Sequence, residues 1–311
     1  MIKIFQSFHN LFFYAILNIG DFMEYINGKN LQKKFLNELK QTVSLLGIKP
    51  TLAVISIDNN KINDIFFKQI KQMIMEVGYE IQYHHYADIS QATLLKLIEK
   101  LNKDPKITSI MIELPIPKHL DFNLIRNAIS KEKDIEGISD INRIKYQNKE
   151  GSFVPNTVLG IKMLLESYAI NVKQKNVVII NRSDLIGIPL FYYFQTQDCT
   201  ITMCHQKTRK LENFVKEADI VISATGSPNF LPAKLFKKDS IVIDIGLNYL
   251  NGKLCGDIDL TNEEEFKGKY FVKSIGGVGP MTITAIAYSV LKSYYLSQKD
   301  KVDSKFLFPD Q

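Results

Sequence analysis

Cysteine is scarce in this chain, which has only Cys199, Cys204 and Cys255 among its 311 residues. An odd number of cysteines without metal-ligand spacing argues against a disulfide framework or a zinc module, and it favours packed thiols in a reducing compartment. The adjacent pair Cys204-His205 could suggest a metal ligand or a nucleophile, but no further ligands lie nearby in the sequence. We therefore expect no metal site and a cytoplasmic protein.

An excess of one charge is also missing. The chain carries 39 lysines and arginines against 33 aspartates and glutamates, and the resulting net charge of +6 is spread along the sequence. This distribution predicts a mildly basic surface, without the concentrated basic patch that marks nucleic-acid binding. We expect no nucleic-acid partner.

A long uninterrupted apolar run is absent from the N-terminus. The first 22 residues, MIKIFQSFHNLFFYAILNIGDF, are apolar but interrupted by Lys3, Gln6, His9 and Asn10. They are too polar and too short for a membrane span, and no small-residue cleavage site marks a signal peptide. Their status is doubtful, and Met23 is a possible true start. We expect a membrane association only if this segment is real and inserted.

Helix and strand patterns alternate in the first half of the chain. Helical periods at 29–47, 63–77, 91–102 and 124–130 alternate with apolar strands at 50–57, 80–88 and 107–115. A chain of this length has room for two domains, each with its own core. The alternation predicts βαβ units and a parallel sheet.

A second series of the same kind begins after Pro155. A helix at 159–169 precedes four apolar strands, in NVVII, CTITMCH, DIVISATG and SIVIDIGLN, with helices ending near Phe194 and spanning 211–218. Strands that each lead into a polar or glycine turn describe a Rossmann-like dinucleotide domain. We expect the last helix, 281–296, to pack back on the first domain.

The nucleotide site of such a domain lies where a helix N-terminus after a strand receives a pyrophosphate. The turn at that place reads NRSDLIGIP, which is not GxGxxG, and Asn181 stands where a tight phosphate turn would prefer glycine. The turn is compatible with a nucleotide site or with an ordinary βα loop. At the next strand end, Lys207 could reach a ribose 2′-phosphate or simply be solvated.

The most specific element is GGVGPMT, residues 276–282, directly before the last helix. Its three glycines let the backbone approach a flat ligand closely, and Pro-Met-Thr opens a helix. Other informative pieces are ELPIPKHL, KDIEGISDIN, VPNTVLG, NRSDLIGIP and GKLCGDID. Taken in order, these pieces resemble the bifunctional methylenetetrahydrofolate dehydrogenase/cyclohydrolase family, from about Met23 to the last helix.

The resemblance implies a two-domain α/β fold. A folate domain at 23–146 is completed by the helix 281–298, a Rossmann-like NAD(P)-binding domain with a parallel sheet spans 147–282, and residues 299–311 form a tail. It implies oxidation of a tetrahydrofolate derivative, 5,10-methylenetetrahydrofolate, by NADP, with NAD possible, and then hydrolysis of the methenyl product to 10-formyltetrahydrofolate. It also implies a homodimer that serves one-carbon metabolism and purine biosynthesis.

The helix after the strand LAVI departs from the family pattern. The family carries Tyr-x-x-x-Lys there, and its lysine supports the proton chemistry of the hydrolysis. Without gaps, these two positions fall on Phe66 and Ile70. A slip by one residue would pair Phe67 with Lys71, but it needs a compensating deletion further along the helix. Otherwise Lys71 is a solvated helix residue.

The remaining candidate site residues follow from the matched motifs. Glu113 replaces the glutamine of the family's QLPLP, and Glu136 replaces the pterin-binding aspartate of DVDG with one more methylene. Asn181 replaces a glycine, and Gln206 replaces a serine that often lies beside the 2′-phosphate. The resemblance assigns folate binding to Glu136, Gly276, Gly277, Gly279, Pro280 and Thr282, and cofactor binding to Asn181, Arg182, Ser183, Gly187, Gln206, Lys207, Thr225 and Gly226.

These departures affect the two reactions unequally. Hydride transfer needs mainly the orientation of substrate and cofactor, so it could survive Ile70, whereas hydrolysis needs a positioned acid or base. The first hypothesis is therefore a dehydrogenase with weak or absent cyclohydrolase activity. The second is a catalytically inactive folate- or nucleotide-binding protein, and the third is a degenerating copy.

Overall fold

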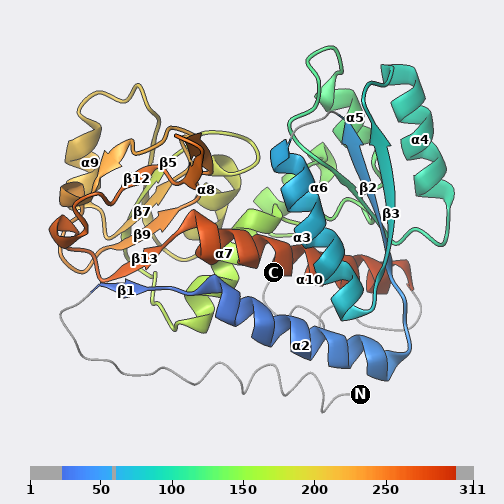
Figure 1. Ribbon diagram of the computed structural model, residues 1–311, viewed down its shortest axis with the longest axis horizontal. Coiled ribbons are helices and arrows are strands. Elements are labelled where there is room, and N and C mark those ends of the chain that lie inside the picture. Colours follow the sequence, from blue (N-terminus) through green and yellow to red (C-terminus); the bar gives the residue numbers. More distant parts are fainter. Residues whose placement is uncertain (1–22, 58–60, 299–311) are drawn as a thin grey trace. The chain divides into compact units, whose positions relative to one another are not determined.

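The computed structural model describes residues 23–57 and 61–298 (Figure 1). They form two compact units. The first unit contains residues 23–32 and 157–282, and the second contains residues 33–156 and 283–298. The expectations for the segment 1–22 and for the tail 299–311 lie outside the described residues.

The division differs from the predicted boundary at residue 147. Residues 23–32 belong to the first unit because β1 (Glu24–Tyr25) pairs in parallel with β13 (Tyr270–Val272) of that unit. Residues 147–156 belong to the second unit, where the Ser152 carbonyl accepts a hydrogen bond from Lys292 Nζ at 2.6 Å. Both differences come from long-range pairing, which local sequence patterns do not reveal.

A six-stranded sheet in the order β1-β13-β9-β7-β5-β6 forms the centre of the first unit. Every neighbouring pair is parallel, as the apolar strand patterns predicted. Two short strands, β1 and β13, extend the four that were predicted. The other main elements are α7 (Asn156–Ser167), β5 (Asn176–Ile180), α8 (Gly187–Gln195), β6 (Thr200–Cys204), α9 (Leu211–Glu217), β7 (Ile220–Ser223) and β9 (Ile241–Asp244).

Smaller elements follow β7 and β9. β10 and β11 pair in antiparallel fashion, and β12 pairs in parallel with β8. Their bounds and those of the short helical turns are β8 (Leu231–Pro232), η1 (Ala233–Leu235), β10 (Asn248–Leu250), β11 (Lys253–Cys255), β12 (Ile258–Asp259), η2 (Glu263–Glu265) and η3 (Ser274–Val278).

The strand order of this sheet fixes where a ligand site can form. Apart from the short strand β1, β5 is the first strand of this sheet in the chain, with β6 on one side of it and β7 on the other. The order therefore reverses at β5, and in open α/β sheets ligands bind in the crevice at the carboxyl ends of the strands at such a reversal. The loops that border this crevice are residues 181–186, after β5, and residues 224–230, after β7.

A three-stranded parallel sheet in the order β3-β2-β4 forms the centre of the second unit, with β2 and β3 side by side (Figure 1). All seven residues of β2 are buried, as expected for a central strand covered on both faces. The bounds are α2 (Gly28–Leu46), β2 (Thr51–Ile57), α3 (Lys61–Val77), β3 (Glu80–Tyr86), α4 (Gln91–Lys103), β4 (Ser109–Ile112), α5 (Phe122–Ala128), α6 (Asp140–Gln147) and α10 (Gly279–Ser297).

The C-terminal part of α10 completes the core of the second unit, as predicted. Ile283, Ile286 and Val290 share one apolar cluster with Ile70 of α3. Tyr79 Oη donates a hydrogen bond to the carbonyl of Ala287 in the same helix at 3.2 Å. Among the described residues, the stretch Ser274–Ser297 is long and apolar enough to cross a membrane, but 67% of its most apolar window is buried, as in a core helix.

Candidate functional site

The helix α3 carries the two positions that the resemblance assigns to tyrosine and lysine. Ile70 is completely buried, with an exposed fraction of 0%, and Phe66 packs against the same apolar cluster. Lys71 lies on the exposed face of the helix. Phe67, the partner of Lys71 in the alternative alignment, is buried and stacks on Tyr83 with ring centroids 3.7 Å apart. The ungapped positions therefore offer no ionisable group.

Two carboxyl groups meet at the carboxyl end of β4. Glu113 directly follows this strand, its backbone N–H donates to the Ile55 carbonyl at 2.9 Å, and its side chain is buried. Glu136 Oε2 accepts a hydrogen bond from the N–H of Ile112 at 3.4 Å. The structure thus brings together the two glutamates that the sequence singled out separately.

Asp134 fixes the loop that carries Glu136. Its carboxylate is fully buried and accepts hydrogen bonds from the N–H of Ile138 at 3.1 Å, the N–H of Ser139 at 2.9 Å and Asn142 Nδ2 at 2.9 Å. Ser139 also caps α6, a short helix that the sequence patterns did not reveal. The backbone around Glu136 is therefore held from both sides.

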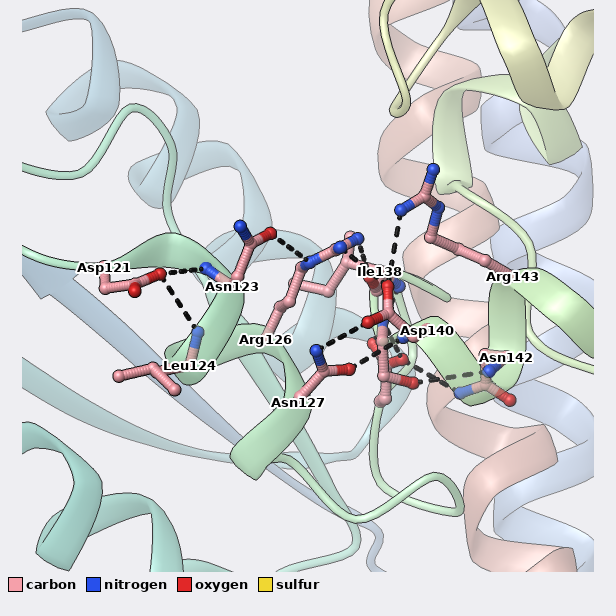
Figure 2. A network of polar contacts seen from close by, with 11 residues as sticks. Asp121, Asn123, Leu124, Arg126, Asn127, Ile138, Asp140, Asn142 and Arg143 are labelled. Carbon is pink, nitrogen blue, oxygen red and sulfur yellow. Dashed lines mark hydrogen bonds and ion pairs between the residues drawn. The ribbon is translucent and has the colours of Figure 1, made fainter.

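A second set of contacts ties α5 to the start of α6 (Figure 2). Arg126 forms an ion pair with Asp140 at 2.6 Å and donates to the Ile138 carbonyl at 3.1 Å. Asn127 Nδ2 donates to Asp140 Oδ2 at 2.8 Å, and Asn127 Oδ1 accepts from the N–H of Asp140 at 2.9 Å. These bonds make the segment between Asp134 and Asp140 a rigid support for Glu136.

The surroundings of Glu136 favour its neutral form. Burial raises the pKa of Glu136 to about 8, and the negative charges of Asp134 and Glu113 add to the effect, while the hydrogen bond from Ile112 opposes it. At pH 7 the Glu136 side chain is therefore mostly a carboxylic acid, which can donate a hydrogen bond as well as accept one.

This pKa predicts a pH-dependent stability. A carboxyl whose folded-state pKa lies at about 8, above its ordinary value of 4.5, stabilises the fold below pH 4.5, and this contribution is lost as the pH rises through 8. Between pH 6 and pH 8 the free energy of unfolding should fall by about 2 kcal/mol through this group. Urea unfolding of the wild type and of Glu136→Gln at both pH values measures it.

The substitution Glu136→Gln should remove that part of the pH dependence, because glutamine does not titrate. The substitution Glu150→Gln is the matched control, since Glu150 is exposed and its Oε1 accepts a hydrogen bond from Asn148 Nδ2 at 3.1 Å. It should leave the wild-type dependence unchanged. If the free energy of unfolding depends equally on pH in the wild type and in Glu136→Gln, Glu136 is not neutral at pH 7.

The glycine run belongs to the first unit. Gly276 has a φ of 87°, a left-handed conformation that glycine adopts without strain. A Cβ on Gly28 would lie 1.9 Å from the carbonyl oxygen of Gly277, so two backbone segments touch there. The Pro280 carbonyl accepts from Gln32 Nε2 at 2.9 Å, and the Thr282 hydroxyl donates to the Val278 carbonyl at 3.1 Å. A folate-binding role for residues 276–282, including Gly279, stays a prediction.

The turn after β5 is organised by the side chain of Asn181. Its Oδ1 accepts hydrogen bonds from the N–H of Ser183 at 2.7 Å and from the N–H of Gly187 at 3.0 Å. Its Nδ2 donates to the carbonyl of Ala224, in the loop after β7, at 2.7 Å. Gly187 is close to the turn, because a Cβ there would lie 2.3 Å from the Asn181 carbonyl oxygen.

The other cofactor-binding candidates lie in the loops that follow β5, β6 and β7. Gln206 Nε2 donates to the Thr225 carbonyl at 2.8 Å and to Ser227 Oγ at 2.7 Å, so it joins the end of β6 to the loop after β7. Gly226 has a φ of 66°, and a Cβ there would meet no atom within 4 Å. Two cationic side chains are exposed nearby in the chain, those of Arg182 and Lys207.

Asp257 bonds the loop after β7, and the sequence patterns did not single it out. It is fully buried, and its Oδ2 accepts from Ser223 Oγ at 2.8 Å and from the N–H of Thr225 at 2.6 Å. Its Oδ1 accepts from the N–H of Ser227 at 3.2 Å and from Asn248 Nδ2 at 3.0 Å. One carboxylate therefore holds the loop after β7 in shape.

Asp244 supports Asp257 from the end of β9. It accepts hydrogen bonds from the N–H groups of Gly246, Asp257 and Ile258, each at 3.0 Å. Burial raises the pKa of Asp244 to about 7, although these hydrogen bonds oppose the shift. The sequence feature that could have indicated these two carboxylates is the glycine beside each of them. A Cβ on Gly246 would lie 2.0 Å from Asp257 Oδ1, and one on Gly256 would lie 1.9 Å from Asp244 Oδ2.

The metal-ligating side chains are not grouped. Within residues 23–57 and 61–298, no three histidine, cysteine, aspartate or glutamate side chains are placed to hold a metal ion. All three cysteines are free thiols, and burial raises the pKa of Cys204 above its ordinary value.

Comparison with known proteins identifies relatives of both units. Residues 26–136 match the family model of the tetrahydrofolate dehydrogenase/cyclohydrolase catalytic domain, and residues 155–298 match that of its NAD(P)-binding domain. The chain is 38% identical over 275 residues to "Bifunctional protein FolD" of Aquifex aeolicus, a match that covers 86% of this chain and 94% of the relative.

Solved structures agree with these matches. The bifunctional enzyme FolD, methylenetetrahydrofolate dehydrogenase/cyclohydrolase, of Campylobacter jejuni superposes with a TM-score of 0.84 at 34% identity, over 88% of this chain and 99% of that one. The Trypanosoma brucei methylenetetrahydrofolate dehydrogenase-cyclohydrolase, solved with NADP and an inhibitor, gives a TM-score of 0.85 at 26% identity, over 89% and 99%.

Proposed function

We propose that this chain, which belongs to the tetrahydrofolate dehydrogenase/cyclohydrolase family, is an NADP-dependent 5,10-methylenetetrahydrofolate dehydrogenase with little or no cyclohydrolase activity. One observation carries the second half of the proposal. Ile70, at the position that the resemblance gives to the proton-transferring lysine, is fully buried in an apolar core.

The two reactions make different demands on the protein. The folate nitrogens stabilise the cation that forms when hydride leaves, so the protein mainly has to orient two ligands and exclude water. Hydrolysis needs protons moved to and from water, and a positioned acid or base contributes about 10²–10⁴ in rate. Ile70 has no group that titrates, and Phe66 has no hydroxyl.

The crevice at β5 and β7 fits a dinucleotide. The strand order reverses there, and Gly226 leaves open space beside its Cα. Arg182, Ser183, Thr225 and Gly226 would hold NADP, with the exposed Arg182 guanidinium as the partner of a phosphate. When bound, NADP supplies the hydride acceptor.

The paired glutamates of the second unit suit the polar edge of a pterin. Glu136 is mostly neutral at pH 7 because burial raises its pKa to about 8, so it can donate as well as accept, and the buried Glu113 lies at the end of the neighbouring strand. We place the protein in one-carbon metabolism, which serves purine biosynthesis. We also propose a cytoplasmic homodimer, in line with the family and with three free thiols.

Ligand-induced stabilisation separates this proposal from the alternatives. Thermal unfolding of the purified chain should shift upward with NADP and with a tetrahydrofolate analogue, by an amount set by ligand excess over Kd. The same protein should reduce NADP when given 5,10-methylenetetrahydrofolate. A shift without reduction would indicate an inactive binding protein, and neither effect would indicate a degenerate copy.

A further inference from the structure

The carboxamide of Asn181 lies across the crevice in which the proposed function places the nucleotide. Its Nδ2 reaches the Ala224 carbonyl in the loop after β7, while its Oδ1 faces the start of α8. Both loops belong to the first unit and border the point where the strand order reverses. A single side chain thus connects the two walls of the crevice.

Four backbone N–H groups of this turn and of the start of α8 already have acceptors. Asn181 Oδ1 takes the N–H groups of Ser183 and Gly187. Ser183 provides the other two acceptors, because its Oγ accepts from the N–H of Ile186 at 3.2 Å and its carbonyl accepts from the N–H of Ile188 at 3.0 Å. Donors at the start of such a helix are the groups that bind a pyrophosphate in a dinucleotide domain.

A phosphate oxygen has to compete with Asn181 for two of these donors. Each N–H carries one hydrogen, so Ser183 and Gly187 can bond a phosphate well only after the Asn181 oxygen has released them. Glycine, the residue that a tight phosphate turn prefers, has no side-chain oxygen that could accept hydrogen bonds from these N–H groups. Breaking the internal hydrogen bonds of Asn181 therefore reduces the binding free energy of ligands that carry a pyrophosphate.

We propose that Asn181 is a specificity-determining residue that lowers the affinity of this chain for the pyrophosphate of a dinucleotide. The inference rests on the proposed function, because it assumes that the crevice is the nucleotide site. In the free protein the carboxamide oxygen satisfies the N–H groups that a phosphate would use. Removing the carboxamide makes those donors available, and ligands without a pyrophosphate gain nothing from the change.

Gln206 shows that the loop does not depend on Asn181 alone. Its Nε2 bonds Thr225 and Ser227, and Asp257 bonds the N–H groups of the same two residues. The loop after β7 thus keeps several contacts when the bond to Ala224 is removed. For this reason the substitution Asn181→Ala should free the N–H groups of Ser183 and Gly187 without unfolding the loop after β7.

Isothermal titration calorimetry of the full chain with two ligands tests the proposal. The ligands are NADP and adenosine 2′-monophosphate, which retains the 2′-phosphate of NADP but has no phosphate at the 5′ position. In Asn181→Ala the Kd for NADP should fall about fivefold, as expected for the loss of a competing hydrogen bond. The Kd for adenosine 2′-monophosphate should change less than twofold.

Two further variants keep the test decisive. Asn181→Gly repeats it with the residue that a phosphate turn prefers, in case the alanine variant does not fold. Asn171→Gly is the matched control, because Asn171 caps the turn before β5 through the N–H of Lys173 at 3.0 Å, and it should change neither Kd.

The outcomes separate the inference from its premise. If the wild type binds NADP and neither Asn181→Ala nor Asn181→Gly binds it more tightly, the inference is overturned and the proposed function is not. An equal change for both ligands would also overturn the inference, because Asn181 would then only shape the loop. Absence of NADP binding in the wild type and both variants would overturn the proposed function as well.

Discussion

Replacing two side chains of α3, Ile70→Lys together with Phe66→Tyr, is expected to raise the rate of methenyltetrahydrofolate hydrolysis by about 10²-fold or more. The physical reason is that the lysine amine can accept and return a proton, which no group at these positions now does. Ile70 lies in an apolar core, and burial lowers the pKa of a lysine. The new amine would therefore be partly neutral near physiological pH, as a base must be.

Hydrolysis of 5,10-methenyltetrahydrofolate supplied directly, followed by the loss of its absorbance, measures this effect. The matched control is Ile70→Met together with Phe66→Tyr, because methionine has a similar length but no amine. Burying a lysine costs on the order of 3 kcal/mol, so the circular dichroism of each variant has to be compared first. A folded double variant that hydrolyses no faster than the methionine control would show that the cleft lacks more than these two groups.

The substitution Asp257→Asn is expected to destabilise the first unit by about 3 kcal/mol and to weaken NADP binding at least about tenfold. The carboxylate accepts two hydrogen bonds on each oxygen. In either orientation an asparagine would turn its NH₂ group toward two of those donors. The loop after β7 would have to move, and with it Thr225 and Gly226.

Urea unfolding and calorimetry with NADP measure the two effects. Asp259→Asn is the matched control, since Asp259 is only partly buried and its carboxylate accepts from a single residue, Thr261, at 2.9 and 2.6 Å. It should cost less than about 0.5 kcal/mol and leave NADP binding unchanged. Similar losses of stability and of NADP affinity in both variants would mean that the hydrogen bonds of Asp257 do not fix the loop after β7.

The sequence predicted most of the regular structure because the strong patterns are local. The buried strand β2 and the helix α3 follow directly from apolar runs and helical periods, and so do β5, β7 and β9. The two-residue strand β1 could not be found in this way, because its parallel partner β13 lies far away in the chain. That pairing joins β1 to the sheet of the first unit.

The candidate site was predicted in part, residue by residue. Motif comparison drew attention to Glu113, Glu136 and Asn181, but it did not show that Glu113 and Glu136 meet at the end of β4 or that Asn181 bonds Ala224. Asp257 was missed, because its partner Ser223 is 34 positions away and its role depends on the fold. Hydrogen bonds between distant segments carry no periodic signal.

The most direct test of the account follows three species at once as the purified chain acts on 5,10-methylenetetrahydrofolate and NADP. We expect reduced nucleotide and the methenyl product to accumulate together, while 10-formyltetrahydrofolate forms no faster than it does without protein. Formation of 10-formyltetrahydrofolate in step with reduced nucleotide would contradict the account, because the hydrolysis would then proceed without a base at position 70. Absence of reduced nucleotide would contradict the dehydrogenase itself.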